Sequence, residues 1–135
     1  MLRAIPPQRL SEEWGWVRNG LIACVEKAGG RYMPEDVYAA IKLGASFLFA
    51  VEWRGDDIGF VVLEQQRDPD GLVLFVFAAW FEPGAGLDCE AEFVDALSAK
   101  AQEIGARRLR MQSTRKGWGR RKFFRPVATI YEVEL

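Results

Sequence analysis

An uninterrupted apolar run over residues 72–81 constrains the fold more than any other feature of the sequence. It is rich in aromatic and β-branched residues, which is typical of a strand covered on both faces. A turn follows, reading Phe-Glu-Pro-Gly-Ala-Gly over residues 81–86. Apolar residues then recur at helical spacing within residues 87–104, at Phe93, Leu97, Ala101 and Ile104. A buried strand, a glycine turn and an amphipathic helix predict half of an α/β crossover.

Two segments before this run predict strands that pair with it. Residues 47–53 and 58–64 are largely apolar, and turn signals follow them at residues 54–57 and 68–71. Because these connections are too short for crossovers, we expect an antiparallel meander of three strands.

The remaining segments predict the other helices and strands. Ser11 is a favourable N-cap for a helix that Gly29 and Gly30 end. Pro34 suits the first position of a second helix, which runs through Leu43. The other expected elements are a strand at residues 1–5, a strand at 108–112, a short helix at 114–124 and a last strand at 127–135.

The composition bounds the class of protein. A chain of 135 residues predicts a single domain over residues 1–135. The sequence has no histidine, which excludes Ser-His-Asp catalysis, histidine-based zinc sites and histidine general bases. Its two cysteines, Cys24 and Cys89, have no metal-ligand spacing, so no metal is expected. The N-terminus lacks a signal-peptide core and no apolar run is long enough to span a membrane, so we expect a cytoplasmic protein without membrane contact.

The positive charge is concentrated in one stretch. Nine Lys or Arg and no Asp or Glu lie between Arg107 and Arg125, which we call the basic block, whereas the rest of the chain has nine basic and nineteen acidic residues. Cations interleaved with aromatics can bind nucleic acid through phosphate contacts and base stacking. The alternative is a last helix whose aromatic residues face the core and whose cations face water.

The order of predicted elements resembles that of the GNAT superfamily, the acyl-coenzyme A-dependent N-acyltransferases. The opening, LRAI at residues 2–5 and LS at 10–11, is similar to the first strand and helix start of that family. The ending resembles GNAT-like proteins encoded by bacteriophages: STRKGW at residues 113–118, FFRPV at 123–127 and YEVEL at 131–135. This resemblance implies a phage or prophage origin, with a location in the bacterial cytoplasm or the virion.

The resemblance also implies an architecture. We expect an α/β (α+β) fold, a three-layer sandwich around a central mixed sheet of six or seven strands. The first two helices should lie on one face and the crossover helix on the other. The strand at residues 72–81 should be central, with the strand at 108–112 parallel to it.

In active GNAT enzymes, a bulged strand pairs with the pantetheine arm, and the pyrophosphate rests on a loop patterned Gln/Arg-x-x-Gly-x-Gly/Ala. The resemblance places acetyl-coenzyme A or another acyl-coenzyme A at Ala78, Ala79, Trp80, Phe81, Gly84, Ala85, Gly86 and Leu87. The two glycines of the loop match the pattern, but Phe81 replaces its polar first residue and Pro83 has no N–H. Asp88 and Glu90 would repel a diphosphate. We expect a degenerate site, and a turn capped by Asp88 is the alternative interpretation.

Acyl transfer to an amine needs a proton acceptor, and three glutamates near strand ends are candidates: Glu52, Glu64 and Glu82. The alternative for each glutamate is an ordinary solvated side chain without a catalytic role. The tyrosine that family members carry on the last helix is replaced here by Phe123 and Phe124, and Tyr131 is expected to pack. The sequence leaves open whether the protein is an enzyme, whether its acceptor is a small amine or a protein, and its oligomeric state. The competing interpretation is a non-enzymatic module for phage assembly or nucleic-acid binding through the basic block.

Overall fold

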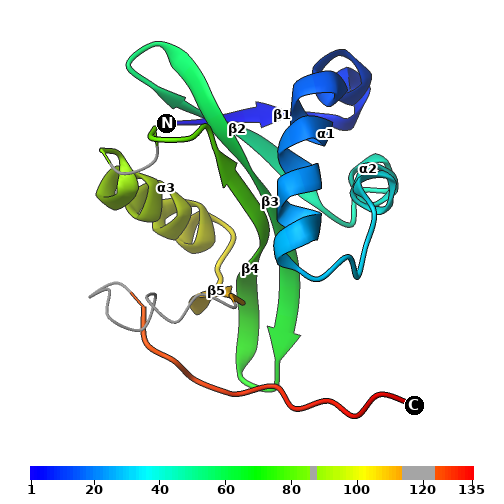
Figure 1. Cartoon of the computed structure of the whole chain (residues 1–135). Coiled ribbons are helices and arrows are strands. Elements are labelled where there is room, and N and C mark those ends of the chain that lie inside the picture. Colours follow the sequence, from blue (N-terminus) through cyan, green and yellow to red (C-terminus); the bar gives the residue numbers. More distant parts are fainter. Residues whose placement is uncertain (86–87, 114–123) are drawn as a thin grey trace.

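The computed structural model describes residues 1–85, 88–113 and 124–135. Helices cover both faces of one sheet (Figure 1). The elements are β1 (Leu2–Ile5), a 3-10 turn (Pro7–Arg9), α1 (Leu10–Lys27), α2 (Pro34–Lys42), β2 (Phe47–Trp53), β3 (Asp56–Asp68), β4 (Gly71–Phe81), α3 (Glu90–Glu103) and β5 (Arg108–Met111).

The sheet has the order β1-β2-β3-β4-β5. Neighbouring strands are antiparallel from β1 to β4, which confirms the predicted meander, and β5 is parallel to β4 as predicted. Two-residue loops join β2 to β3 and β3 to β4, too short for any other arrangement. β3 is the middle strand, and β4 lies between β3 and β5.

The expected number of strands is wrong for the part of the chain that the structure describes, where the sheet has five strands rather than six or seven. Residues 127–135 were expected to form a strand, but they belong to no helix or strand. A strand needs a neighbour for its backbone hydrogen bonds, and this segment pairs with none of the described strands. The expected helix at 114–124 lies outside the described residues except for Phe124, which is in no helix.

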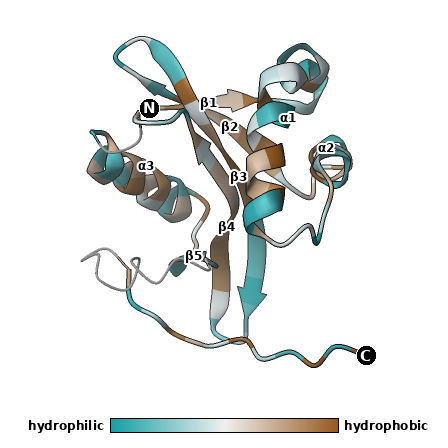
Figure 2. Ribbon diagram, in the orientation of Figure 1, coloured by the Kyte–Doolittle hydropathy of each residue, from teal (hydrophilic) through white to brown (hydrophobic). Residues whose placement is uncertain are grey.

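Two apolar layers hold the helices on the sheet, as the sequence predicts. α1 and α2 pack on one face against side chains that include Leu48, Phe60 and Val62. α3 packs on the other face, with Phe93 and Leu97 in one cluster with sheet residues. Figure 2 shows hydrophobic residues along β4 between these layers and hydrophilic residues toward the end of β3. Alternate residues of the central strands therefore enter opposite cores.

The helix starts differ in detail from the sequence prediction. α1 begins at Leu10 after the 3-10 turn, so Ser11 lies in its first turn and Arg9 takes the N-cap position. Pro34 is the first residue of α2 as predicted, and the Asp36 carboxylate accepts the Met33 N–H at 2.8 Å. α3 begins at Glu90 rather than at residue 87.

Candidate functional site

The sheet opens between β4 and β5. β4 pairs with β5 only over residues 73–76. Val73 pairs with Arg108 at one end of this stretch, and Val76 pairs with Met111 at the other. Beyond that point β4 continues to Phe81, and no described strand lies on its β5 side. The backbone of residues 77–81 is therefore a free strand edge, able to pair with an extended ligand.

A β-bulge marks the start of this free edge. Val62 of β3 pairs with Ala78, but the next residue, Leu63, pairs with Val76, so Phe77 is an extra residue on β4. A bulge increases the local twist and turns the strand away from its neighbour. The strand therefore bends at the point where pairing with β5 stops.

The side chains of residues 78–81 mostly serve the cores. Ala78 is buried beneath α1, and the Trp80 ring stacks on Phe60 with 5.8 Å between ring centroids. Phe81 packs edge-to-face on Phe93 of α3 at 5.0 Å. Only Ala79 of these four is exposed. The predicted cofactor-binding residues of β4 therefore lie together. Because their side chains mostly pack in the cores, they would bind a ligand through their backbone N–H and C=O groups.

The loop after β4 has few N–H groups to offer a phosphate. The Glu82 N–H donates to the Ile58 carbonyl at 2.8 Å, and the Ala85 N–H donates to the Glu82 carbonyl at 3.0 Å. Pro83 has no N–H. Gly84 has φ = 81°, a conformation that favours glycine. The predicted binding residues Gly86 and Leu87 lie outside the described residues.

Negative charge gathers at the start of α3. Glu90 and Glu92 lie in its first turn, and Asp88 precedes its N-cap residue. Cys89 takes the N-cap position without a side-chain cap hydrogen bond, so capping by Asp88 does not occur. Burial, followed by the charges of Glu92, Asp88 and Glu90, raises the pKa of the Cys89 thiol. The helix start is therefore unfavourable for a diphosphate.

The structure separates the three candidate bases. Glu52 lies opposite Asp57 at one end of the sheet and forms an ion pair with Arg3 at 3.7 Å. Glu82 follows the end of β4 and is exposed. Glu64 lies further along β3, opposite Phe75 and close to the bulge. Of the three, Glu64 alone lines a pocket beside the bulge.

That pocket has a volume of about 150 Å³ and lies on the α2 side of the sheet, lined by Asp36, Val37, Ala40, Ser46, Glu64 and Phe77. Ser46 is the buried polar residue of this region, and its hydroxyl donates to Glu64 Oε1 at 3.5 Å. The bulge residue Phe77 lines the pocket, so the pocket adjoins β4 where its free edge begins.

Sequence reasoning missed Tyr32 as a member of this region. Its ring packs edge-to-face on Phe77, with 5.0 Å between ring centroids. Burial raises the pKa of Tyr32 to about 12, so its hydroxyl stays protonated near neutral pH. The signal in the sequence is only a loop tyrosine after Gly29 and Gly30, which does not reveal that it packs against β4.

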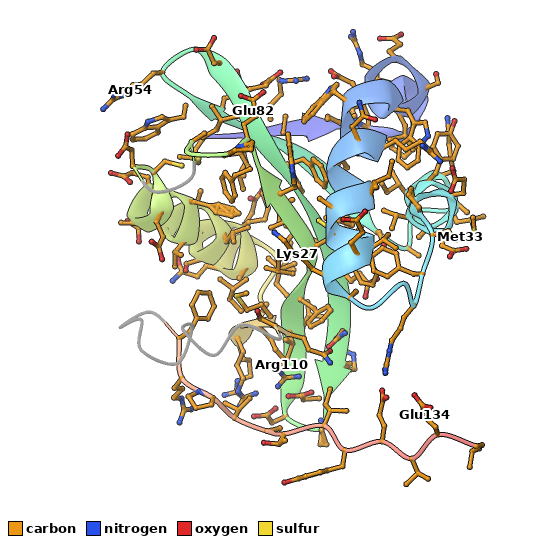
Figure 3. The ribbon with its side chains drawn as sticks, in the orientation of Figure 1. Lys27, Met33, Arg54, Glu82, Arg110 and Glu134 are labelled. Atoms are coloured by element: carbon orange, nitrogen blue, oxygen red, sulfur yellow. The ribbon has the colours of Figure 1, made fainter. Side chains whose placement is uncertain are left out.

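Three of the four described cations of the basic block contact Asp68 or Asp70. Arg108 donates two hydrogen bonds to the Asp70 carboxylate, at 2.9 and 2.6 Å, and Arg110 donates two to Asp68, at 3.1 and 2.6 Å. Arg107 donates to the Asp70 carbonyl at 2.8 Å. Figure 3 shows Arg110 beside the lower part of β4. Five further cations of the block lie outside the described residues, so its role in binding stays a prediction.

The described residues contain neither a cluster of metal-ligating side chains nor a membrane-spanning helix. No group of three or more Cys, Asp or Glu side chains there could hold a metal ion. No helix there is both long and apolar enough to cross a membrane.

Solved structures share this fold. A ribosomal-protein-alanine N-acetyltransferase from Brucella melitensis biovar Abortus 2308 superposes with a TM-score of 0.69 at 16% identity, over 100% of this chain and 98% of that one. A predicted acetyltransferase from Clostridium acetobutylicum, solved with acetyl-CoA, gives 0.66 at 12% identity, over 99% and 95%. An aminoglycoside acetyltransferase from an uncultured soil metagenomic sample gives 0.64 at 9%, over 100% and 97%.

The sequence itself is far from those of known families. No protein-family model matches it, and no curated protein matches it. The likeness to the solved structures extends over the whole length of the chain at low identity, and at that distance it establishes the fold. The chain therefore shares the fold of these solved acetyltransferases, which is the fold that the order of its elements predicts.

Proposed function

We propose that this protein is an N-acyltransferase of the GNAT type, with a degenerate site that binds acyl-coenzyme A weakly and supports slow transfer to an amine. The observation that carries the proposal is the free edge of β4 over residues 77–81, which begins at the bulge. An extended pantetheine arm needs such an edge, since it carries amide groups that pair as a strand does. A predicted acetyltransferase of the same fold was solved with acetyl-CoA, which supports a coenzyme ligand for this fold.

The weak affinity follows from the loop after β4. Among residues 82–85, two N–H groups are used within the protein and Pro83 has none, which leaves Gly84. Asp88 and Glu90 repel a diphosphate at the same place. We therefore expect a dissociation constant for acetyl-coenzyme A on the order of 1 mM, about −4 kcal/mol of binding free energy.

The pocket beside the bulge is where we place the acceptor, a small amine or an amine of a protein. Glu64 would take a proton from the amine as its nitrogen attacks the thioester carbonyl. The new C–N bond forms, the C–S bond breaks, and the coenzyme leaves as a thiolate that takes a proton. Tyr32, protonated and packed on Phe77, is a candidate source of that proton.

We retain a phage or prophage origin as part of the proposal, with action in the bacterial cytoplasm. It rests on the sequence ending alone, because much of the resembling stretch, including Gly117 and Trp118, lies outside the described residues.

Calorimetric titration with acetyl-coenzyme A tests the binding. We expect the double variant Glu82→Gln, Pro83→Ala to bind at least about tenfold more tightly, since it gains an N–H and loses a negative charge. Glu103→Gln makes the same charge change at the other end of α3 and is the control. Tight binding by the unaltered protein would show that the site is intact, and no binding by the repaired variant would reject the proposal.

Release of the coenzyme thiol in the presence of a panel of amines tests the transfer. Glu64→Gln should lower the rate about a hundredfold, the range expected for losing a general base. Glu52→Gln should leave the rate unchanged, because Glu52 lies at the far end of β2 against Arg3. Equal rates for both variants would show that Glu64 is not the base.

A further inference from the structure

The pocket beside the bulge contains two carboxylates and no positively charged side chain. Asp36 comes from α2 and Glu64 from β3, and the other lining residues are uncharged: Val37, Ala40, Ser46 and Phe77. The ion pairs among the described residues all involve other acidic groups. Two carboxylates without a cationic partner favour a positively charged ligand in this pocket.

Glu64 interrupts the apolar pattern of its strand. Phe60 and Val62 of β3 enter the core beneath α1 and α2, and Glu64 is the next residue on that face of the strand. The Glu64 side chain is half-buried, so its carboxylate has lost part of its hydration. An ammonium group of a ligand would offset that cost, because burial of a charge is tolerated when the charge is paired.

Ser46 gives a second and independent indication of a ligand. This residue is only 4% exposed and lines the same pocket. Its hydroxyl lies 3.5 Å from Glu64 Oε1, which is longer than the roughly 2.5–3.0 Å of an ordinary O–H···O hydrogen bond. A buried hydroxyl with only a long contact has hydrogen-bonding capacity left for a ligand. An ammonium group beside Ser46 and Glu64 would donate to both side chains.

Asp36 lies at the end of the pocket that opens to water. Its side chain is exposed, and Figure 3 shows Met33, the residue before α2, at the edge of the molecule. Asp36 Oδ2 accepts the Met33 N–H at 2.8 Å, which leaves Oδ1 for a ligand. The pocket therefore has one carboxylate beside the buried Ser46 and a second carboxylate at its mouth.

The size and the apolar walls of the pocket limit what joins the two charges. A volume of about 150 Å³ holds a molecule of about six non-hydrogen atoms, the size of benzene. Val37, Ala40 and Phe77 are apolar, so they suit methylene groups. Two amino groups joined by a chain of about four carbons have this size and this character, whereas an amine on a sugar ring is larger than the pocket.

We propose that the acceptor is a short linear diamine, an inference that rests on the acyl transfer proposed above. One amino group lies at Glu64 and Ser46, beside the bulge, where it reacts. The second stays protonated and pairs with Asp36. Asp36 is then the residue that determines specificity, and a lysine side chain of a protein is a poorer acceptor because it carries no second charge.

Binding in the absence of coenzyme tests the substrate class. Amide NMR titrations of the protein with butanediamine and with butylamine should show at least about tenfold tighter binding of the diamine, the range expected for one more hydrogen bond between charged groups. A peptide with one internal lysine should bind like butylamine. Equal affinities for the three ligands would overturn the proposal. Because no coenzyme is present, a failure of acyl transfer would leave this result unchanged, so the two proposals fail separately.

Asp36→Asn tests the residue that selects the diamine. Asparagine keeps an oxygen that accepts the Met33 N–H, so α2 should keep its start while the charge is lost. We expect the preference for butanediamine over butylamine to disappear. Glu35→Gln is the matched control, since it removes the same charge one residue earlier, where Glu35 pairs with Arg18. A preference that survives in Asp36→Asn, or is lost equally in both variants, would contradict the role of Asp36.

A pair of alanines on α2 tests the location. Ala40 lines the pocket, so Ala40→Leu should fill it and weaken the binding of both amines at least about tenfold. Ala39 is exposed and does not line the pocket, so Ala39→Leu should bind both amines as the unaltered protein does. Circular dichroism checks that both variants are folded. Unchanged diamine binding by a folded Ala40→Leu variant would place the diamine elsewhere and overturn the proposal.

Discussion

Replacing Gly20 of α1 with alanine should destabilise the protein, although alanine is the better helix former. A Cβ atom at this position would lie 2.4 Å from Cε2 of Phe60 and 2.7 Å from the nearest atom of Trp80. Carbon atoms in contact prefer roughly 3.5–4.0 Å, so α1 or both rings would have to move. The absence of a side chain on Gly20 is what lets α1 approach β4 beside its free edge.

The magnitude follows from two opposing effects. Gly-to-Ala substitution in a helix interior stabilises by about 1 kcal/mol. Overpacking a filled core costs about 1–3 kcal/mol, and the upper part of this range applies because Phe60 is fully buried and stacked on Trp80. We expect a net loss of about 1–2 kcal/mol in the free energy of unfolding.

Gly15 provides the control on the same helix. Nothing lies within 4 Å of a Cβ atom built at Gly15, so Gly15→Ala should raise the free energy of unfolding by about 1 kcal/mol. Urea denaturation followed by circular dichroism measures both variants. If Gly20→Ala were as stable as Gly15→Ala, the result would show that α1 does not lie as close to Phe60 and Trp80 as described here.

Three further outcomes follow from charge and burial. Burial raises the pKa of Tyr32 to about 12, so the protein loses free energy of unfolding as pH rises from the unfolded-state pKa of this tyrosine toward that value. Tyr32→Phe should lessen this loss, measured by urea denaturation at alkaline pH. Hydrogen bonds from Arg110 lower the pKa of Asp68, so its stabilisation is lost as pH falls through the lowered value; Asp68→Asn should flatten the acid-denaturation curve. The alternative function, nucleic-acid binding by the basic block, predicts an affinity that falls steeply with salt and is lost in the double variant Arg120→Glu, Arg121→Glu, measured by fluorescence anisotropy.

The fold could be predicted from local patterns because its contacts are mostly sequential. The three-strand meander joined by two-residue loops, the crossover helix and the parallel strand after it all follow from periodicity and turn residues. The prediction of a strand at residues 127–135 was wrong, although apolar and acidic residues clearly alternate at its end. Alternation specifies a strand's faces but does not supply the neighbouring edge on which pairing depends.

The candidate site could be predicted only in part. The run ending at Phe81 indicated which backbone could face a ligand, and Pro83 indicated a poor phosphate loop. The bulge at Phe77 could not be predicted, because it depends on the register between β3 and β4. The packing of Tyr32 on Phe77 and the placement of Glu64 in a pocket also join residues far apart in the chain.

By itself, the sequence determined the order of the elements, their buried faces, the absence of histidine chemistry and the clustering of positive charge. Tertiary structure alone decided that β5 stops pairing at Val76, that Glu64 rather than Glu52 or Glu82 lies beside the bulge, and that Arg108 and Arg110 are held by aspartates. Periodicity and turn chemistry depend only on residues close together in the chain, so the sequence alone reveals them. Register, pockets and ion pairs depend on distances between segments, which form only when the chain is folded.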